Sequence, residues 1–464
     1  MTRTLDTDVV IIGSGTAGIN ARREVERAGK RWVVVEGGAY GTMCARVGCM
    51  PSKLLIAAGD RRHEILGSDV FGIHVDHAAV QVDGRAVMQR VQRERDRFVG
   101  FVLDANDRLP RTQNLQGRAR LVSTTSVLIE DHTRVDARAI VIATGSAPTV
   151  PPELAALGDR LLTNETVFEL PDLPSSLAVI GTGVIGLELG QAMHRLGVRT
   201  TLFSRHGSFA GLTDPEVHAR ARAHFCTELD VRLGSVVAAE RADGGARLRW
   251  LEADGPREGV FEYVLAATGR HPEVAGLGLE LLGLALDARG VPLHDRATLQ
   301  CGDAPIFLAG DVTGDLTVLH EAVDDGRIAG RNAARFPDVE PGARRTPMAV
   351  VFSDPNCAFV GRRFTELDPD ATAIGEVSYD NQGRSRMAAK NTGLVRMYGA
   401  RADGRLIGAE LFGPRMEHMA HLLAWSIQSG LTVDQMLAMP FYHPVFEEGI
   451  RTGLQDLQRR MSRG

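Results

Sequence analysis

The sequence has little lysine and no excess of positive charge. Only three of its 53 basic residues are lysines, at positions 30, 53 and 390, so the other 50 are arginines. Acidic residues number 58, which gives a net charge of −5, and the two signs alternate along the chain. No basic stripe is available for a phosphate backbone or an acidic lipid surface, so we expect neither a nucleic-acid partner nor a membrane partner. Since arginine is strongly favoured elsewhere, the lysine at position 53 indicates a place where guanidinium would not serve.

Long apolar runs are also missing. A membrane span needs about 18 consecutive apolar residues, and the sequence contains no such run. The first eight residues lack the basic and then apolar layout of a signal peptide. With 464 residues, 44% apolar and 24% charged, the composition is that of a globular protein of roughly three domains. We therefore expect a cytoplasmic enzyme.

Cysteines are too few and too unevenly placed for the disulfide framework of a secreted protein. Three of the five cysteines have no partner at a useful spacing, and we interpret them as core or surface thiols: Cys226, Cys301 and Cys357. Cys44 and Cys49 lie only five positions apart, so this pair needs a chemical explanation.

Two stretches of the chain follow the same β-α-β pattern. The first predicts a buried strand over 8–12, a helix to about residue 28 and a strand over 32–35, with Gly13, Gly15 and Gly18 in the turn between strand and helix. Glycines let the backbone approach a pyrophosphate, and the helix N-terminus favours an anion. Glu36 follows the first glycine by 23 positions, where a carboxylate can accept hydrogen bonds from a ribose. This pattern predicts a dinucleotide site.

The second stretch predicts a strand over 177–180, a helix to about 196 and a strand over 199–203, with Gly181, Gly183 and Gly186 in the turn. The position equivalent to Glu36 is Ser204, so no ribose carboxylate is expected here. Arg205 follows, and an arginine at this place commonly pairs with the 2′-phosphate of NADP. A solvated loop arginine is an equally good interpretation.

The remaining pattern predicts further helices and strands. A charged amphipathic helix is expected over 84–109, and strands that run into glycine turns over 139–145 and 263–269. From about residue 346 the chain predicts alternating strands, then helices over 417–429 and 433–437, which is typical of a separate α+β domain.

The segment from Cys44 to Lys53 is the most informative part of the sequence. Five residues of α-helix rise about 7.5 Å, more than the roughly 5.5 Å usual between bridged Cα atoms, so a disulfide needs a distorted turn. Gly48 and Pro51 permit that distortion. A bridge closing so small a loop is better suited to redox exchange than to stabilisation. The alternative is two buried, reduced cysteines.

Near the C-terminus, His443 precedes Glu447 and Glu448. A histidine held by a carboxylate is a general acid/base arrangement, because the carboxylate fixes the tautomer and stabilises the protonated ring. Taken alone, such a histidine is more often structural.

Together these motifs resemble the FAD-dependent pyridine nucleotide disulfide oxidoreductases, the family of dihydrolipoamide dehydrogenase, glutathione reductase and mercuric reductase. The resemblance covers the whole chain and includes the two glycine fingerprints, the C-x4-C-x-P-S-K segment, two Ala-Thr-Gly turns and Ala309-Gly-Asp311. It implies FAD and either NAD or NADP as cofactors. It implies that Lys53 faces the flavin, paired with Glu188, and that Asp311 holds the ribityl chain. Further residues implied at the cofactor sites are Ala119, Thr144, Gly145 and Gly269.

The resemblance also implies how the redox residues work. Cys49 exchanges electrons with the flavin, Cys44 exchanges disulfides with substrate, and His443, oriented by Glu448, moves the proton of the substrate thiol. A small dithiol or disulfide, or a lipoyl domain, is the implied partner, and a homodimer shares each active site between subunits. No metal site is expected.

The expected fold class is α/β, with two Rossmann-like dinucleotide-binding domains and a C-terminal α+β dimerisation domain. Residues 1–148 would bind FAD, 149–269 NAD(P), 270–344 would complete the FAD domain, and 345–464 would form the dimer. Met43 and Arg46 depart from the Thr and Asn usual around the first cysteine, and the tail lacks the cysteine pair of mercuric reductases.

Dihydrolipoamide dehydrogenase activity is our first expectation, because the Ser-Lys after the cysteine motif is closest to that branch. An NADPH-dependent reductase of a small disulfide such as glutathione disulfide is the alternative favoured by Ser204 and Arg205. A flavoprotein that serves only as a structural partner in a multienzyme complex is disfavoured by Cys44 and Cys49.

Overall fold

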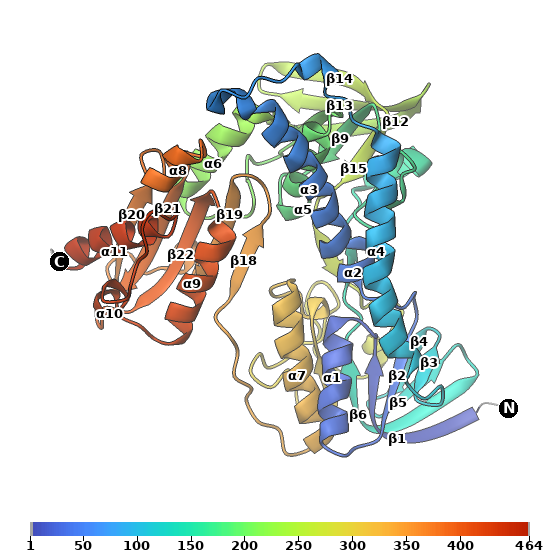
Figure 1. Ribbon diagram of the computed structural model, residues 1–464. Coiled ribbons are helices and arrows are strands. Elements are labelled where there is room, and N and C mark those ends of the chain that lie inside the picture. Colours follow the sequence, from blue (N-terminus) through green and yellow to red (C-terminus); the bar gives the residue numbers. More distant parts are fainter. Residues whose placement is uncertain (1–2, 463–464) are drawn as a thin grey trace. The chain divides into compact units, whose positions relative to one another are not determined.

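The computed structural model describes residues 3–462, which fold into two compact units (Figure 1). Unit 1 takes in the chain up to residue 50, residues 93–149 and residues 270–345. Unit 2 takes in residues 51–92, 150–269 and 346 onward. Each unit is therefore assembled from three separate stretches of sequence.

Unit 1 is built on a seven-stranded sheet. Five of its strands run parallel, and β17 joins the sheet beside β6 although it lies far along the chain. The strands are β1 (Arg3–Ile12), β2 (Trp32–Glu36), β3 (Asn114–Gln116), β4 (Ala119–Ser123), β5 (Ser126–Ile129), β6 (Thr133–Ile142) and β17 (Ile306–Leu308). Val9 and Ile11 pack into one core cluster while Val10 and Ile12 pack into another, so β1 is buried on both faces as expected.

Helices α1 (Thr16–Arg27) and α7 (Leu319–Arg335) lie side by side in unit 1 (Figure 1). Their backbones approach closely because α7 presents glycines. An ideal Cβ on Gly326 would lie 2.2 Å from the carbonyl oxygen of Ala17, and one on Gly330 would lie 2.4 Å from that of Ala21. Any larger residue at these positions would separate the two helices.

Unit 2 contains a second parallel sheet, with five strands in the order β11-β10-β9-β15-β8. They are β8 (Leu161–Leu162), β9 (Ser176–Ile180), β10 (Arg199–Phe203), β11 (Asp230–Arg232) and β15 (Tyr263–Ala266). Helix α5 (Val184–Arg195) connects β9 to β10, and α6 (Pro215–Glu228) connects β10 to β11. An antiparallel sheet of β12 (Ser235–Ala242), β13 (Gly245–Glu252) and β14 (Gly255–Phe261) completes this part.

The C-terminal part of unit 2 is an antiparallel five-stranded sheet with helices. Its strands are β18 (Met348–Val351), β19 (Asn356–Gly361), β20 (Thr372–Ser378), β21 (Leu394–Ala400) and β22 (Leu406–Gly413). Its helices are α8 (Gly383–Met387), α9 (Met416–Gln428), α10 (Val433–Leu437) and α11 (Glu448–Met461). This is the α+β arrangement expected from the sequence.

The remaining elements are short or contain residues of both units. They are α2 (Met43–Val47), α3 (Cys49–Leu66), α4 (Gly84–Asp107), the strand pair β7 (Ser146–Pro148) and β16 (Arg270–Pro272), and 3₁₀ turns at 68–71, 77–79, 152–160, 167–169, 279–281, 311–313 and 364–366. No helix within residues 3–462 is long and apolar enough to cross a membrane.

Candidate active site

The first glycine turn has the shape that a dinucleotide site requires. Gly13 has φ +105°, and an ideal Cβ there would lie 2.3 Å from the carbonyl oxygen of Ala143. Gly18 would place a Cβ 2.0 Å from the carbonyl oxygen of Gly13. Gly15, in contrast, has nothing within 4 Å of its ideal Cβ. The outer glycines are thus required for packing, whereas Gly15 leaves open space at the start of α1.

Glu36 ends β2 beside this turn. Its carboxylate accepts hydrogen bonds from the Ser14 backbone N–H and hydroxyl, both at 2.8 Å, and from the Gly38 N–H at 2.8 Å. The Gly117 N–H donates to the Glu36 carbonyl at 2.9 Å, which brings the start of β4, with Ala119, to the same end of the sheet.

Thr144, Gly145 and Asp311 lie at the same sheet edge as Gly13, because they follow the carboxyl ends of the parallel strands β6 and β17. The Thr144 hydroxyl oxygen is buried without a hydrogen-bond partner in the described part of the chain. Asp311 accepts a hydrogen bond from the Ser146 hydroxyl at 2.9 Å. Ligands of parallel sheets bind at this edge.

These features of unit 1 fit FAD. The open space at Gly15 and the N-terminus of α1 suit a pyrophosphate. Glu36 suits a ribose, and the Thr144 hydroxyl offers a polar atom that protein groups leave unsatisfied. Asp311, held by Ser146 at the same sheet edge, is the residue that the resemblance expects at the ribityl chain.

The second glycine turn, in unit 2, repeats the first. An ideal Cβ on Gly181 would lie 2.3 Å from the Ala267 carbonyl oxygen, and one on Gly186 would lie 2.0 Å from that of Gly181, while Gly183 has nothing within 4 Å. Gly269 follows β15 at the same edge with φ +112°. The turn therefore fits a second dinucleotide, the nicotinamide cofactor.

Ser204 occupies the position that Glu36 has in unit 1. Gly181 N–H donates to Phe203 O just as Gly13 N–H donates to Val35 O, which places Ser204 and Glu36 at equivalent points. Ser204 is 3% exposed and accepts a hydrogen bond from the Thr182 hydroxyl at 2.7 Å. Arg205, the next residue, is exposed. No acidic side chain takes the ribose position here.

The cysteine segment is interrupted between the two thiols. Helix α2 ends at Val47 and α3 begins at Cys49, because Gly48 adopts φ −125° and ψ −117°. An ideal Cβ on Gly48 would lie 3.1 Å from the Cα of Cys44, so the chain folds back onto the first cysteine. Cys44 is half-buried and Cys49 exposed. The chain therefore departs from regular helix between the two cysteines, as a disulfide between them would need.

The other cysteines differ from this pair. Cys301 and Cys357 are buried, and burial raises the pKa of each thiol to about 12. Such thiols are poor nucleophiles, because the thiolate is the reactive form. Cys226 is exposed on α6.

Arg270 is a site residue that sequence reasoning missed. Its guanidinium donates to the sulfur of Met43 at 2.8 Å and to the hydroxyl of Ser146 at 2.9 Å, and Ser146 in turn holds Asp311. The unusual residue before Cys44 is therefore connected to the residue expected to bind the ribityl chain. The other departure, Arg46, donates to the Ala39 carbonyl at 3.3 Å. The contact could not be predicted from the sequence, because Met43 and Arg270 lie 227 positions apart.

Lys53 and Glu188 form a partly buried ion pair within unit 2. Lys53 Nζ lies 2.7 Å from Glu188 Oε2, and Glu188 is 4% exposed. The other carboxylate oxygen accepts from the Phe352 N–H at 2.9 Å, and the Lys53 ammonium lies 4.6 Å from the centre of the Phe352 ring. The ammonium is thus held by a carboxylate and an aromatic face.

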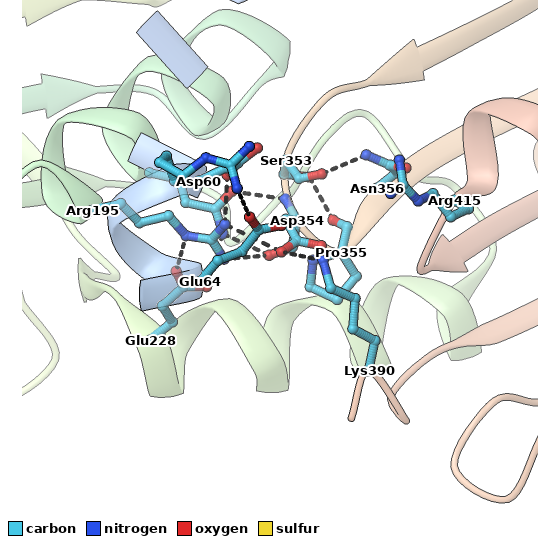
Figure 2. Close-up of polar contacts among 12 residues, drawn as sticks. Asp60, Glu64, Arg195, Glu228, Ser353, Asp354, Pro355, Asn356, Lys390 and Arg415 are labelled. Atoms are coloured by element: carbon cyan, nitrogen blue, oxygen red, sulfur yellow. Dashed lines mark hydrogen bonds and ion pairs between the residues drawn. The ribbon is translucent and has the colours of Figure 1, made fainter. Parts of the chain in front are cut away.

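The same face of α5 carries a charge cluster around the buried Arg195 further along the helix (Figure 2). Arg195, 3% exposed at its side chain, contacts Asp60 at 2.8 Å, Glu228 at 2.7 Å and Asp354 at 3.3 Å. Burial alone would raise the pKa of Glu228, but hydrogen bonds from His224, Arg195 and Gln191 lower it to about 2. Burial raises the pKa of Asp60 despite the guanidinium.

His443 and Glu448 are adjacent in unit 2. Nδ1 of His443 lies 2.9 and 3.1 Å from the two carboxylate oxygens of Glu448, and the hydrogen bond with His443 lowers the pKa of Glu448. The His443 side chain is 76% exposed and Glu448 is 29% exposed. Nε2 of the ring is therefore available to a partner while Nδ1 is held. Within residues 3–462, no group of three or more His, Cys, Asp or Glu side chains could hold a metal ion.

Most of the chain matches two domains of one known protein family. Residues 7–326 match the pyridine nucleotide-disulphide oxidoreductase domain, and residues 347–453 match the dimerisation domain of the same family. The chain belongs to this family. As a pyridine nucleotide-disulphide oxidoreductase it is a flavoprotein enzyme that uses FAD and NAD(P)H, which confirms the cofactors expected from the motifs.

Several curated members of the family are similar to nearly all of this chain. Dihydrolipoyl dehydrogenase 3 of Pseudomonas aeruginosa is 29% identical over 473 residues, covering 98% of each chain. Dihydrolipoyl dehydrogenase of Geobacillus stearothermophilus is 28% identical, covering 96% of this chain and 94% of that protein. Mercuric reductase of Bacillus cereus is 26% identical, covering 99% of this chain and 72% of that protein.

Solved structures share the fold. LpdA of Mycobacterium tuberculosis superposes with a TM-score of 0.81 at 24% identity, covering 98% of this chain and 99% of that one. The Cu(II) complex of the HOCl-induced flavoprotein disulfide reductase RclA of Escherichia coli gives 0.80 at 21% identity, with the same coverage. The α/β class with a C-terminal dimerisation domain is thereby confirmed.

Proposed function

We propose that this oxidoreductase is a dihydrolipoyl dehydrogenase-like enzyme of the cytoplasm. In the net reaction a dithiol loses two electrons and two protons to become a disulfide, NAD⁺ gains a hydride, and one proton enters the solvent. The observation that supports it most is the cysteine pair around the Gly48 break, in a chain whose whole length matches dihydrolipoyl dehydrogenases.

The residue roles follow the chemistry of the side chains. Cys44 exchanges disulfides with the substrate and Cys49 passes the electrons on, since the two thiols close a small redox loop. His443 takes the proton of the substrate thiol at Nε2, while Glu448 holds Nδ1. The exposure of His443 suits a site completed by the second subunit. Lys53, paired with Glu188, keeps the flavin-facing role implied by the resemblance.

FAD supplies two-electron transfer between nicotinamide and thiols when it is bound. For this group we propose Gly13, Gly15, Gly18, Glu36, Ala119, Thr144, Gly145 and Asp311 as binding residues. For the nicotinamide cofactor we propose Gly181, Gly183, Gly186, Ser204, Arg205 and Gly269. The proposed domains are residues 1–148 and 270–344 for FAD, 149–269 for NAD(P) and 345–464 for the dimer.

A second candidate, an NADPH-dependent reductase of a small disulfide, is favoured by the buried Ser204 beside the exposed Arg205. A steady-state comparison separates the two. The first candidate predicts efficient NAD⁺ reduction with dihydrolipoamide and little oxidation of NADPH by glutathione disulfide. The reverse pattern would establish the second candidate and reject the first.

Arg205 can be tested directly. If its guanidinium binds a 2′-phosphate, Arg205→Ala should lower kcat/KM for NADPH by about one to two decades, since a charge-assisted contact contributes roughly 1.5–3 kcal/mol. kcat/KM for NADH should stay unchanged, because NADH has no such phosphate. An unchanged ratio of the two values would make Arg205 a solvated surface residue.

A further inference from the structure

The loop that carries His443 lies between α10 and α11 and is held from outside its own sequence. Side chains from the segment that follows β20 reach two of its backbone carbonyls. Gln382 donates through Nε2 to the carbonyl oxygen of Val445 at 2.7 Å. The hydroxyl of Tyr379 lies 2.7 Å from Met419 Sδ and 3.1 Å from the carbonyl oxygen of Phe446, and the carbonyl is the stronger acceptor for its one proton.

Tyr379 is rigidly placed. Its side chain is 0% exposed, and burial raises the pKa of its hydroxyl, so the phenol keeps the proton that it donates. An ideal Cβ on Gly449 would lie 2.3 Å from the Tyr379 hydroxyl oxygen. The absence of a side chain at Gly449 therefore lets the phenol reach the loop at the first turn of α11.

Gln382 is fixed at its other end. Its Oε1 accepts a hydrogen bond at 2.7 Å from the Ser385 N–H, which caps α8. The amide thus bridges the start of α8 and the loop, with acceptor and donor both used. Glutamate at this position would keep the cap but could not donate to Val445.

The loop needs these contacts because its histidine is not held by burial. His443 is 76% exposed and is oriented through Nδ1 by Glu448. The same carboxylate accepts from the Val445 N–H at 3.2 Å, so Val445 is held on its carbonyl by Gln382 and on its N–H by Glu448. Displacing Val445 disturbs the carboxylate that orients the ring.

We propose that Tyr379 and Gln382 are positioning residues for the His443–Glu448 acid/base pair, acting through the carbonyls of Phe446 and Val445. This inference rests on the proposed role of His443. Neither side chain has to touch the substrate. Their contribution is to fix the loop backbone, since misplacing a catalytic group by about 1 Å costs up to about 10²-fold in rate.

The test uses the FAD-loaded enzyme and follows its two half-reactions separately by stopped flow. Tyr379→Phe keeps the ring and removes the donor, and Gln382→Glu keeps the cap and removes the donor. Each should slow the disulfide half-reaction about 10-fold and shift its pH profile in the same direction as Glu448→Gln. Flavin reduction by NADH should be unchanged, because it does not use His443.

Two comparisons make the result specific. Gln435→Ala removes the capping box that Gln435 forms with Thr432 at α10, and should leave the pH profile unchanged even if the melting temperature falls. In a His443→Ala background, Gln382→Glu should produce no further loss in the disulfide half-reaction, because its effect passes through the histidine.

The possible failures are distinguishable. If His443→Ala and Glu448→Gln leave the disulfide half-reaction unchanged, both the proposed function of the pair and this inference are wrong. If those variants are impaired while Tyr379→Phe and Gln382→Glu stay within twofold of the parent with the same pH profile, only the inference is overturned. Equal loss in both half-reactions would also overturn it, because that pattern reports general destabilisation.

Discussion

Gly48 separates two thiols that would otherwise lie along one continuous helix. Cys44 belongs to α2 and Cys49 is the first residue of α3, where the helix N-terminus carries a partial positive charge. A thiol at such a position gains thiolate character. Cys44 is the second residue of the five-residue helix α2, so the clear difference between the two cysteines is their exposure, which supports different roles for them.

This difference yields a spectroscopic prediction. Reduced enzyme should show a long-wavelength absorbance from the Cys49 thiolate interacting with the flavin, and Cys49→Ser should abolish it. Cys44→Ser should show the band before reduction, because Cys49 then has no disulfide partner. Cys226→Ser, at an exposed thiol on α6, is the control and should behave as the parent. A band that survives in Cys49→Ser would contradict the proposed roles.

Sequence reasoning singles out residues that belong to local motifs. The glycine turns, the cysteine pair and the spacing of His443 and Glu448 are all visible within short stretches. Arg270, Tyr379 and Gln382 were missed because each reaches its partner from a distant part of the chain, 227 positions in the case of Arg270 and Met43. A single sequence carries no signal for such side-chain contacts.

At the scale of elements, the glycines in the turn between β1 and α1 have different surroundings. Gly18 is surrounded by backbone, whereas Gly15 faces open space at the helix start. Gly15 also has φ −71°, which any residue can adopt, so backbone strain does not require glycine there. The fold therefore does not require a glycine at this position, whereas the proposed FAD site does.

Alanine substitutions should therefore separate binding from stability. Gly15→Ala should weaken FAD binding by about tenfold or more while the urea midpoint stays near that of the parent, because only the approach of the pyrophosphate is blocked. Gly18→Ala should destabilise the protein by about 1–3 kcal/mol through overpacking. FAD fluorescence titration and urea unfolding measure the two effects. Equal destabilisation by both variants would refute the conclusion that Gly15 serves FAD binding and Gly18 serves packing.

The strands and helices themselves were largely predictable. The strand 199–203 and the helix 433–437 have the expected bounds, and the helix expected over 84–109 is α4, which ends at Asp107. The addition of β17 beside β6 was not predictable, since it depends on a pairing between residues 306–308 and 140–142. Local periodicity indicates a strand but not its neighbour.

The side chains of helix α5 contact charged residues that lie far apart in the sequence. Its residues Glu188, Gln191 and Arg195 share one face, and that face holds the backbone of residues 352–354. Arg195 is surrounded by three carboxylates, and Lys390 lies 3.5 Å from one of them, that of Asp354 (Figure 2). Removing the guanidinium would leave three partly exposed carboxylates facing one another around the place of a buried cation.

Arg195→Met should consequently cost about 1.5–3 kcal/mol of unfolding free energy, the usual effect of losing charge-assisted hydrogen bonds, because the carboxylates left behind are partly exposed. Arg249→Met is the matched control, because Arg249 is 53% exposed and pairs with Glu240 and Glu258 on a surface sheet. The control should lose no more than about 1 kcal/mol. Urea unfolding of both variants provides the comparison, and equal losses would show that the Arg195 cluster stabilises the protein no more than a surface ion pair does.

At the scale of the whole molecule, the question is which chain supplies the acid/base pair. A dimerisation domain is present over residues 347–453, and His443 belongs to it, about 400 positions after the cysteines. A symmetric dimer creates two equal sites. If these sites are shared, each combines the cysteines of one chain with the histidine of the other, and the enzyme is active only as a dimer.

A subunit-mixing experiment tests this sharing. Cys44→Ser and His443→Ala proteins should each be inactive, because every site lacks one essential group. After random exchange, about half of the dimers are mixed, and each mixed dimer has one complete site, made from the intact cysteines of one chain and the intact histidine of the other. About a quarter of the parent activity should therefore return. If each chain used its own histidine, every site would keep a defect and no activity would appear. Absence of recovery, with mixed dimers demonstrated by differently tagged subunits, would refute the shared site.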